Sequence, residues 1–306
     1  PCNTFRVRRE SHHLDLVIEL PGAAPIVIEN KVVSLPEEEQ LERYSADNIR
    51  ALGRGEAQKG LLSLTDPGWE NAEHRGWVHV PWASLSGRLA KHLAMTRPEG
   101  DFVRELAARW ESLLWDLSQV LELTRPLLGE SLLLDGDLRA VLDTVRIGDA
   151  VEKARVRRFR QDLARLLGPD VMRRVDLSSA FGSGGPIVDV KVPLSDGALL
   201  GWQLQGQQWR RFLIAPEELQ GKAPGLRQAR IAYAQSQHRE WFDLSAVSAM
   251  ISCLPAANAD FKHYAPGFVY DYVKVPEATI AELLKLAAVE TERALAYAAE
   301  RSRPSD

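Results

Sequence analysis

Three charged residues stand inside two short apolar runs near the start of the chain. The runs are LDLVIEL at 14–20 and IVIENKVV at 26–33, and they contain Asp15, Glu29 and Lys31. A charge buried in a strand is costly unless it is paired or binds a metal. Two neighbouring carboxylates can hold a divalent cation, and an adjacent ammonium can orient a water molecule. These residue types therefore fit metal-assisted hydrolysis.

The alternation of side chains along a strand decides whether the three charges can meet. In the first run Asp15 shares a face with Val17, and in the second Glu29 and Lys31 share a face with Val27. If the two runs pair as a hairpin, all three charges converge on one surface of a sheet. The alternative is a cross-strand salt bridge on a solvated sheet face, which needs no chemistry.

The elements that would position these residues form a compact pattern. β-branched or alternating segments predict strands at 4–9, 14–20, 26–33, 60–65 and 77–80. Between the third and fourth strands, Ser34 and Glu37 form a capping box that opens a helix ending near Gly53. The order β-β-β-α-β-β predicts an α/β core.

The whole constellation resembles the PD-(D/E)XK nuclease superfamily, and most closely those members whose motif reads "ID…iENK…QLxrY". The matching residues are Asp15, then Glu29, Asn30 and Lys31 in IENK, and Gln40, Leu41 and Tyr44 in QLERY. The segment WVHVPWASL is similar to the strand-to-helix segment that follows in such proteins. The resemblance covers about residues 3–97, and Leu14 stands where the family name has proline.

This resemblance implies a restriction-endonuclease-like mixed sheet core with flanking helices. It also implies a nuclease dependent on Mg²⁺ or Mn²⁺ that acts on nucleic acid, with DNA as the expected partner, in defence, restriction or repair. The implied metal ligands are Asp15, Glu29 and, through a backbone carbonyl, Asn30. The implied catalytic residues are Asp15, Glu29, Lys31, Gln40 and Tyr44, with Lys31 positioning the attacking water. Gln40 and Tyr44 lie four residues apart on one helix face and would contact a phosphate or that water.

The sequence pattern changes from strand-rich to helical at residue 98. This change predicts a nuclease-like core at 1–97 and an accessory or substrate-binding region at 98–306. Apolar residues recur at helical spacing between 102 and 120 and predict a long amphipathic helix. Further along, 138–167 has helical character, 187–215 contains three short strands, and a proline-initiated helix is expected at 276–301. The C-terminal region is therefore expected to be helical with a smaller β part.

Positive charge concentrates in one segment of this acidic chain. A nucleic-acid surface is expected there, built from Lys153, Arg155, Arg157, Arg158 and Arg160. The alternative is a solvated helix face whose arginines pair with acids such as Glu152 and Asp162. A second cluster around Trp202, Trp209 and Arg210 mixes rings with amide and guanidinium donors, although such tryptophans are more often part of a core.

Composition narrows the setting. The 306 residues carry a net charge of −4, which excludes a uniformly basic protein but not a local basic groove. Two cysteines far apart in the sequence favour a reducing compartment, so the cytoplasm is expected. No apolar run approaches membrane-spanning length, so no membrane partner is expected. The alternative to a nuclease is an inactive nucleic-acid-binding or scaffold protein that retains the fold.

Overall fold

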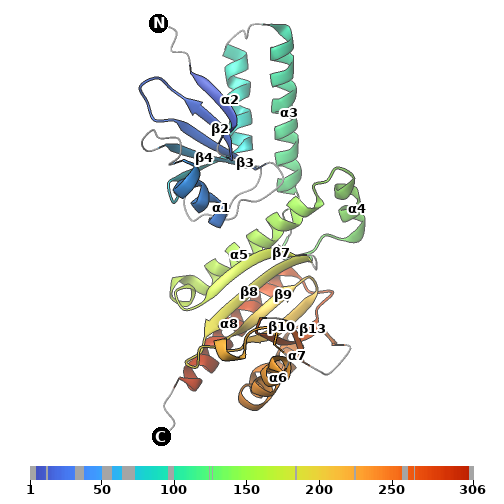
Figure 1. The fold of residues 1–306 in the computed structure, drawn as a ribbon. Coiled ribbons are helices and arrows are strands. Elements are labelled where there is room, and N and C mark those ends of the chain that lie inside the picture. Colours follow the sequence, from blue (N-terminus) through green and yellow to red (C-terminus); the bar gives the residue numbers. More distant parts are fainter. Residues whose placement is uncertain are drawn as a thin grey trace. The chain divides into compact units, whose positions relative to one another are not determined.

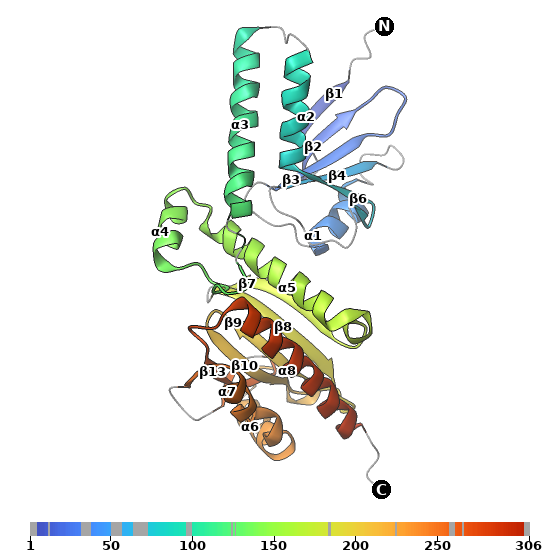
Figure 2. The ribbon, with the colours of Figure 1, turned by 180° about the vertical axis from the view of Figure 1, so that it is seen from behind.

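Figures 1 and 2 show a computed structural model of the chain from two opposite sides. The structure describes residues 5–11, 13–31, 38–49, 57–63, 73–95, 100–123, 125, 127–182, 185–223, 225–256, 261–264 and 266–302. The chain divides into two compact units, Pro1–Arg125 with Ala140–Ala154 and Pro126–Arg139 with Arg155–Asp306. The boundary expected at residue 98 falls inside the first of these units and stays a prediction.

A mixed sheet forms the centre of the first unit. Its strands are β1 (Arg6–Ser11), β2 (Leu14–Glu19), β3 (Ile26–Lys31), β4 (Gln58–Ser63), β5 (Glu73–His74) and β6 (Trp77–Pro81), in the spatial order β1-β2-β3-β4-β6-β5. The first three strands are an antiparallel meander, whereas β3, β4 and β6 run parallel. The carboxyl ends of these three parallel strands therefore meet at one edge of the sheet, where open α/β sheets bind their ligands.

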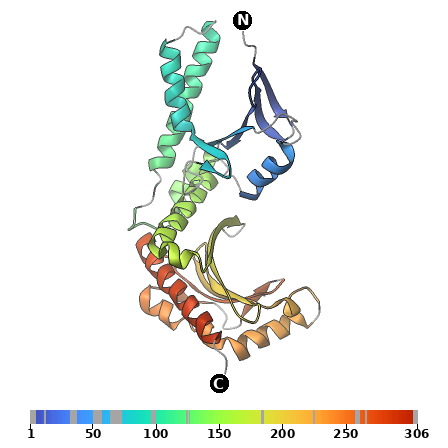
Figure 3. The same cartoon turned by 90° about the vertical axis from the view of Figure 1, so that its left-hand side faces the viewer.

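The connection from β3 to β4 contains helix α1 (Glu38–Arg43), which continues into the π-helical turn η1 (Tyr44–Asn48). The turn packs its apolar side on the sheet, and the resulting core consists of Leu14, Val17, Val27, Leu41, Ile49, Leu61 and Trp77. In Figure 3, α1 lies on one side of this sheet and α2 on the other. The expected helix is thus confirmed in part, while its capping box at Ser34 and Glu37 lies outside the described residues.

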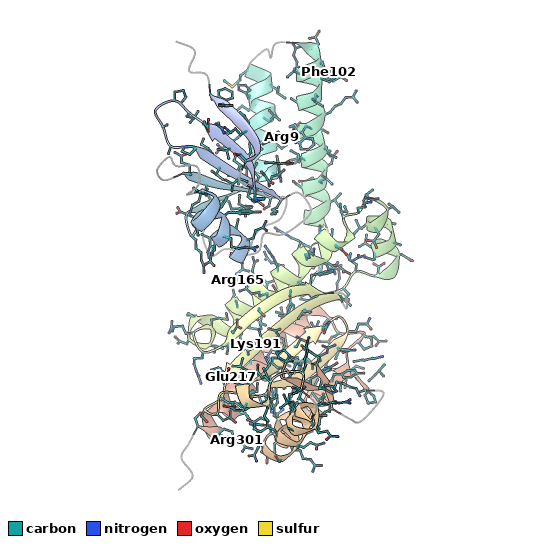
Figure 4. The ribbon with its side chains drawn as sticks, in the orientation of Figure 1. Arg9, Phe102, Arg165, Lys191, Glu217 and Arg301 are labelled. Atoms are coloured by element: carbon teal, nitrogen blue, oxygen red, sulfur yellow. The ribbon has the colours of Figure 1, made fainter. Side chains whose placement is uncertain are left out.

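Helices α2 (Trp82–Met95) and α3 (Asp101–Leu123) pack together as a hairpin. The hydroxyl of Ser86 donates to Glu111 Oε1 at 2.9 Å, and the rings of Trp82 and Trp110 meet edge-on. The long amphipathic helix expected from the sequence is confirmed as α3. However, its first apolar residue, Phe102, is 76% exposed at the helix start labelled in Figure 4, because the packed stripe of α3 lies around Glu111 and the buried Leu114.

The helical region expected at 138–167 is two helices, α4 (Gly136–Thr144) and α5 (Gly148–Met172). They are separated at Arg146, whose φ of 58° lies in the left-handed region and ends the first helix. Near its end α5 contains Gly168 with a non-helical backbone, followed directly by Pro169. Proline cannot donate within a helix, so the helix axis changes there.

The second unit is built on an antiparallel sheet. Its strands are β7 (Asp176–Gly182), β8 (Gly185–Pro193), β9 (Leu199–Gln205), β10 (Gln208–Ile214), β11 (Leu254–Pro255), β12 (Lys262–Tyr264) and β13 (Phe268–Lys274). The spatial order is β11-β13-β10-β9-β8-β7, and β12 pairs with β13. The three strands expected at 187–215 are confirmed as β8, β9 and β10, while the sequence pattern did not reveal β7 and β13. Shorter helical segments join β10 to β11, namely η3 (Glu217–Leu219), α6 (Leu226–Gln237), η4 (Arg239–Phe242) and α7 (Ser245–Met250).

Helix α8 (Ile280–Arg301) packs on one face of this second sheet. It begins at Ile280 and not at Pro276 as expected, because Thr279 caps it: the Thr279 hydroxyl accepts from the Glu282 N–H, and the Glu282 carboxylate accepts from the Thr279 N–H. No helix in the described part of the chain is long and apolar enough to cross a membrane.

The sheet face under α8 contains the tryptophans of the second cluster. Trp202 and Trp209 are fully buried and stack on one another, with ring centroids 4.7 Å apart. The indole N–H of Trp202 donates to Thr291 of α8 at 2.9 Å. These two rings belong to the core, as tryptophans in such a pattern more often do, and they are not exposed for stacking on bases.

Candidate active site

The register of β2 and β3 brings Asp15 and Glu29 to the same place. Val17 of β2 stands opposite Val27 of β3, and both are fully buried beneath α1 and η1. Asp15 lies two residues before Val17, and Glu29 two residues after Val27 in the antiparallel partner. Both carboxylates therefore project from the same face of the sheet at neighbouring positions.

Glu29 is buried, with only 1% of its surface exposed. Its Oε1 lies 2.7 Å from Lys31 Nζ and accepts a longer hydrogen bond, 3.4 Å, from the amide of Gln40. Its other oxygen, Oε2, is buried and has no hydrogen-bond partner among the described residues. A buried carboxylate oxygen without a partner is costly, so this atom is poised to accept a ligand.

Asp15 is fixed to the neighbouring strand by a backbone contact. Its Oδ2 accepts the N–H of Asn30 at 2.7 Å. Asn30 follows Glu29 directly, so this bond holds the Asp15 carboxylate next to Glu29.

Helix α1 adds two polar side chains to this group. The Gln40 amide donates to the Tyr44 hydroxyl at 2.7 Å as well as reaching Glu29. The two residues are one helical turn apart, and the contact persists although Tyr44 begins the π-helical turn η1. The structure thus brings together Asp15, Glu29, Lys31, Gln40 and Tyr44, which the sequence had singled out.

The electrostatics of the site follow from this packing. Burial raises the pKa of the Glu29 carboxyl above its usual value, the Lys31 ammonium opposes that rise, and the nearby Asp15 carboxyl adds to it. The raised pKa means that the ionised form of Glu29 is held at a cost in the metal-free protein. A cation between the two carboxylates would remove both their repulsion and that cost.

The donor set fits a hard divalent cation. Asp15 and Glu29 supply carboxylate oxygens, and the unpartnered Oε2 of Glu29 is already desolvated. Across the described residues, no three His, Cys, Asp or Glu side chains form a metal-binding group, so the two carboxylates would need backbone or water oxygens to complete the coordination. The backbone carbonyl expected near Asn30 is in the right part of the chain to be one of them.

A separate cavity of about 260 Å³ lies beside η1 and β6. Its walls are formed by Leu41, Glu42, Ser45, Ala46, His74, Arg75 and Trp77. None of the five catalytic candidates lines it, so the cavity is not the site of the proposed chemistry.

Two side chains of the same sheet face extend the site and were not singled out from the sequence. Ser63 is fully buried at the end of β4, and its Oγ lies 2.9 Å from His79 Nε2 on β6. In the register, Ser63 stands beside Lys31, and His79 stands two strands from Glu29 in the row Glu29–Leu61–His79. The signal that could have found Ser63 is its position at the carboxyl end of a parallel strand, whereas His79 lies in the middle of β6.

The basic residues expected to contact nucleic acid all lie on α5, but they differ in surroundings. Arg155 is only 7% exposed, and its guanidinium donates to the carbonyls of Leu132 and Ser131 at 3.0 and 2.5 Å. Arg160 donates to the carbonyl of Leu177 at 3.1 Å. These two side chains therefore bind neighbouring segments of their own unit.

The other three basic residues lie further toward the solvent. Arg158 is exposed and pairs with Asp162 at 3.2 Å, as the solvated-face alternative had it. Lys153 and Arg157 are partly exposed on the same helix. The structure thus does not gather all five basic side chains on one open surface.

The meander, the crossover helix and the acid–acid–lysine group together define a restriction-endonuclease-like α/β domain. Residues 1–73 match the family model of the PD-(D/E)XK nuclease superfamily, and that span contains all five catalytic candidates. The resemblance drawn from the motif is therefore confirmed for this part of the chain. Searches of the curated proteins and of the solved structures return no significant match.

Proposed function

We propose that this protein is a Mg²⁺- or Mn²⁺-dependent nuclease that hydrolyses phosphodiester bonds in DNA, in the setting of defence, restriction or repair in the cytoplasm. The superfamily match over residues 1–73 supports the nuclease class. The observation that carries the proposal is the convergence of Asp15, Glu29 and Lys31 around a buried carboxylate oxygen that has no partner in the described part of the chain.

The roles of the residues follow from their contacts. Asp15, Glu29 and a backbone carbonyl near Asn30 would hold the cation, which supplies positive charge at the phosphate and a more acidic water. Lys31, already 2.7 Å from Glu29, would orient the attacking water and stabilise the charge that develops on the phosphoryl oxygens. In the reaction the water oxygen bonds to phosphorus while the bond from phosphorus to the leaving oxygen breaks. The attacking water gives up a proton to bulk water, and the leaving oxygen takes one from bulk water.

Gln40 and Tyr44 would act as positioning groups. Their mutual hydrogen bond and the contact of Gln40 with Glu29 hold the carboxylate from the side of α1. An amide and a hydroxyl at this place can also donate to a phosphate oxygen or to the water.

The alternative is a protein that keeps the fold and binds nucleic acid without cleaving it. Such a protein would have no need of a buried Glu29 beside a second carboxylate and an ammonium, because the buried charge only destabilises the metal-free fold. The complete acid–acid–lysine group therefore favours catalysis.

Incubation with a panel of substrates tests the proposal: single- and double-stranded DNA, linear and circular, and the matching RNAs. We expect cleavage of DNA with Mg²⁺ or Mn²⁺ and none with EDTA. Cleavage that persists in EDTA would contradict the metal-dependent mechanism. Binding of DNA without cleavage in any metal would favour the inactive alternative.

We further propose that Lys153, Arg155, Arg157, Arg158 and Arg160 mark the segment of α5 that meets the DNA backbone, with Arg157 and Arg158 making the direct contacts. The double change Arg157→Glu/Arg158→Glu should weaken DNA binding similarly for all sequences and lower the slope of log affinity against log salt by about 1 to 2, because phosphate contacts release counterions without reading bases. Binding titrations at several salt concentrations measure both quantities. The control is Arg104→Glu/Arg109→Glu on α3, which alters net charge equally. An equal loss of affinity in both variants would show that the basic residues of α5 form a solvated helix face without specific DNA contacts.

A further inference from the structure

A serine–histidine pair lies on the catalytic face of the first sheet, on the neighbouring parallel strands β4 and β6. Ser63 Oγ and His79 Nε2 are 2.9 Å apart. The pair cannot be a nucleophile and its base, since Ser63 is fully buried. Its hydroxyl instead fixes the orientation of the imidazole.

The sheet register places this imidazole in line with the candidate site. His79 is paired with Leu61 of β4, and Leu61 is paired with Glu29 of β3. His79 follows the buried Trp77 by two residues, so both project toward the face covered by α1. Its contact with Ser63, which stands beside Lys31, directs the ring toward the edge where the strands end.

The distance across the strands fits a bound polynucleotide. Adjacent strands lie about 4.8 Å apart, so the backbone of His79 is about 10 Å from that of Glu29. Neighbouring phosphates of one strand are further apart than their rise of about 3.4 Å along the helix axis, so this span corresponds to about one to three nucleotides. A scissile phosphate held at Glu29 would therefore place a phosphate of the same strand, within three nucleotides, in reach of His79.

We propose that His79, oriented by Ser63, binds a non-scissile backbone phosphate of the substrate strand and so sets where along that strand the scissile phosphate sits. The inference rests on the proposed nuclease function. His79 is a binding residue and Ser63 a positioning residue, and neither takes part in bond breaking. An imidazole N–H suits this role because a hydrogen bond to an anionic oxygen is among the stronger ones.

The test combines variants of the protein with variants of the substrate. Once a cleaved DNA is known, each phosphate within three nucleotides of the scissile one is replaced in turn by a neutral methylphosphonate. In the wild type we expect one replacement to raise KM about tenfold with kcat changed less than twofold. His79→Ala should raise KM by a similar factor on unmodified DNA. In this variant the same methylphosphonate replacement should raise KM no further.

Matched variants separate binding from folding. His79→Gln keeps a side-chain donor, so its KM should fall between those of His79→Ala and the wild type. Ser63→Ala should reduce the effect of the methylphosphonate at that same phosphate and at no other. The control His92→Ala on α2 should match the wild type. Additive effects of His79→Ala and the methylphosphonate, or equal losses at every phosphate, would overturn the proposal. Absence of any cleavage by the wild type would instead count against the nuclease function itself, while the same coupling, measured by DNA binding, would still support or overturn the role of His79.

Discussion

Lys31→Met should lower the rate of DNA cleavage at least a hundredfold. The ammonium of Lys31 lies 2.7 Å from Glu29 and is the cationic group placed to orient the water and to offset charge at phosphorus. Removing one such preorganised charge typically costs a factor of about 10² to 10³ in the chemical step. Single-turnover cleavage at saturating DNA and metal measures that step without interference from product release.

The control for this result must separate chemistry from folding. Lys31 is only 15% exposed at its side chain and is the counter-charge of buried Glu29, so its loss destabilises the metal-free protein. Lys31→Arg keeps that counter-charge and should melt nearer to wild type, yet still cleave slowly, because a planar guanidinium does not replace a compact ammonium. Lys59→Met on β4, where the lysine contacts Ser45 and a backbone carbonyl, should cleave normally. Wild-type rates in a folded Lys31→Met would remove Lys31 from the mechanism.

Mn²⁺ should stabilise the wild-type protein against unfolding, and Asp15→Asn and Glu29→Gln should lose most of that gain. A ligand that binds only the folded state stabilises it by about 2.7 kcal/mol at a hundredfold excess over its dissociation constant. Each variant replaces a charged oxygen donor of the proposed pair by an amide of the same shape. Melting curves in EDTA and in a series of Mn²⁺ concentrations measure the gain for each protein.

The melting curves recorded in EDTA test a second expectation. In EDTA, Asp15→Asn should leave stability unchanged or raise it, because it removes a carboxylate that helps to raise the pKa of Glu29 while its amide oxygen can still accept the Asn30 N–H. A salt bridge would behave in the opposite way, since loss of one charged partner destabilises the protein in every buffer. A wild-type melting temperature that does not change with Mn²⁺, combined with a destabilised Asp15→Asn in EDTA, would contradict the metal site.

The candidate site of the first unit could be predicted because the side-chain alternation that forms its strands also determines which sheet face carries the charged residues. Strand alternation alone placed Asp15 and Glu29 on faces that could meet, and the register that brings Val17 opposite Val27 confirms it. The spacing of Gln40 and Tyr44 within one helical turn gave their mutual contact. By contrast, Lys31 pairs with Glu29 in its own strand, and not across strands as the salt-bridge alternative had it.

The second unit was harder to predict because its partners are far apart in the sequence. Trp202 and Arg211 stand opposite each other in β9 and β10. Their burial depends on α8, which supplies Thr291 to Trp202 and Glu290 to Arg211 from about 80 residues or more away. Arg155 was likewise expected to contact a phosphate, but its guanidinium donates instead to the carbonyl of Leu132. Ser63 and His79 are 16 residues apart and meet only because β4 and β6 are neighbours in the sheet.

Isothermal titration of Mn²⁺ into the metal-free protein tests the central claim most directly, because it needs no knowledge of the substrate. The wild type should bind Mn²⁺ at a saturable site, and Asp15→Asn and Glu29→Gln should lose that binding while remaining folded. The control Asp162→Asn, which removes a surface carboxylate paired with Arg158 and Arg165, should bind Mn²⁺ like the wild type. If the wild type and the Asp15 and Glu29 variants give the same heats of binding, Asp15 and Glu29 do not hold a metal and the proposed mechanism is wrong.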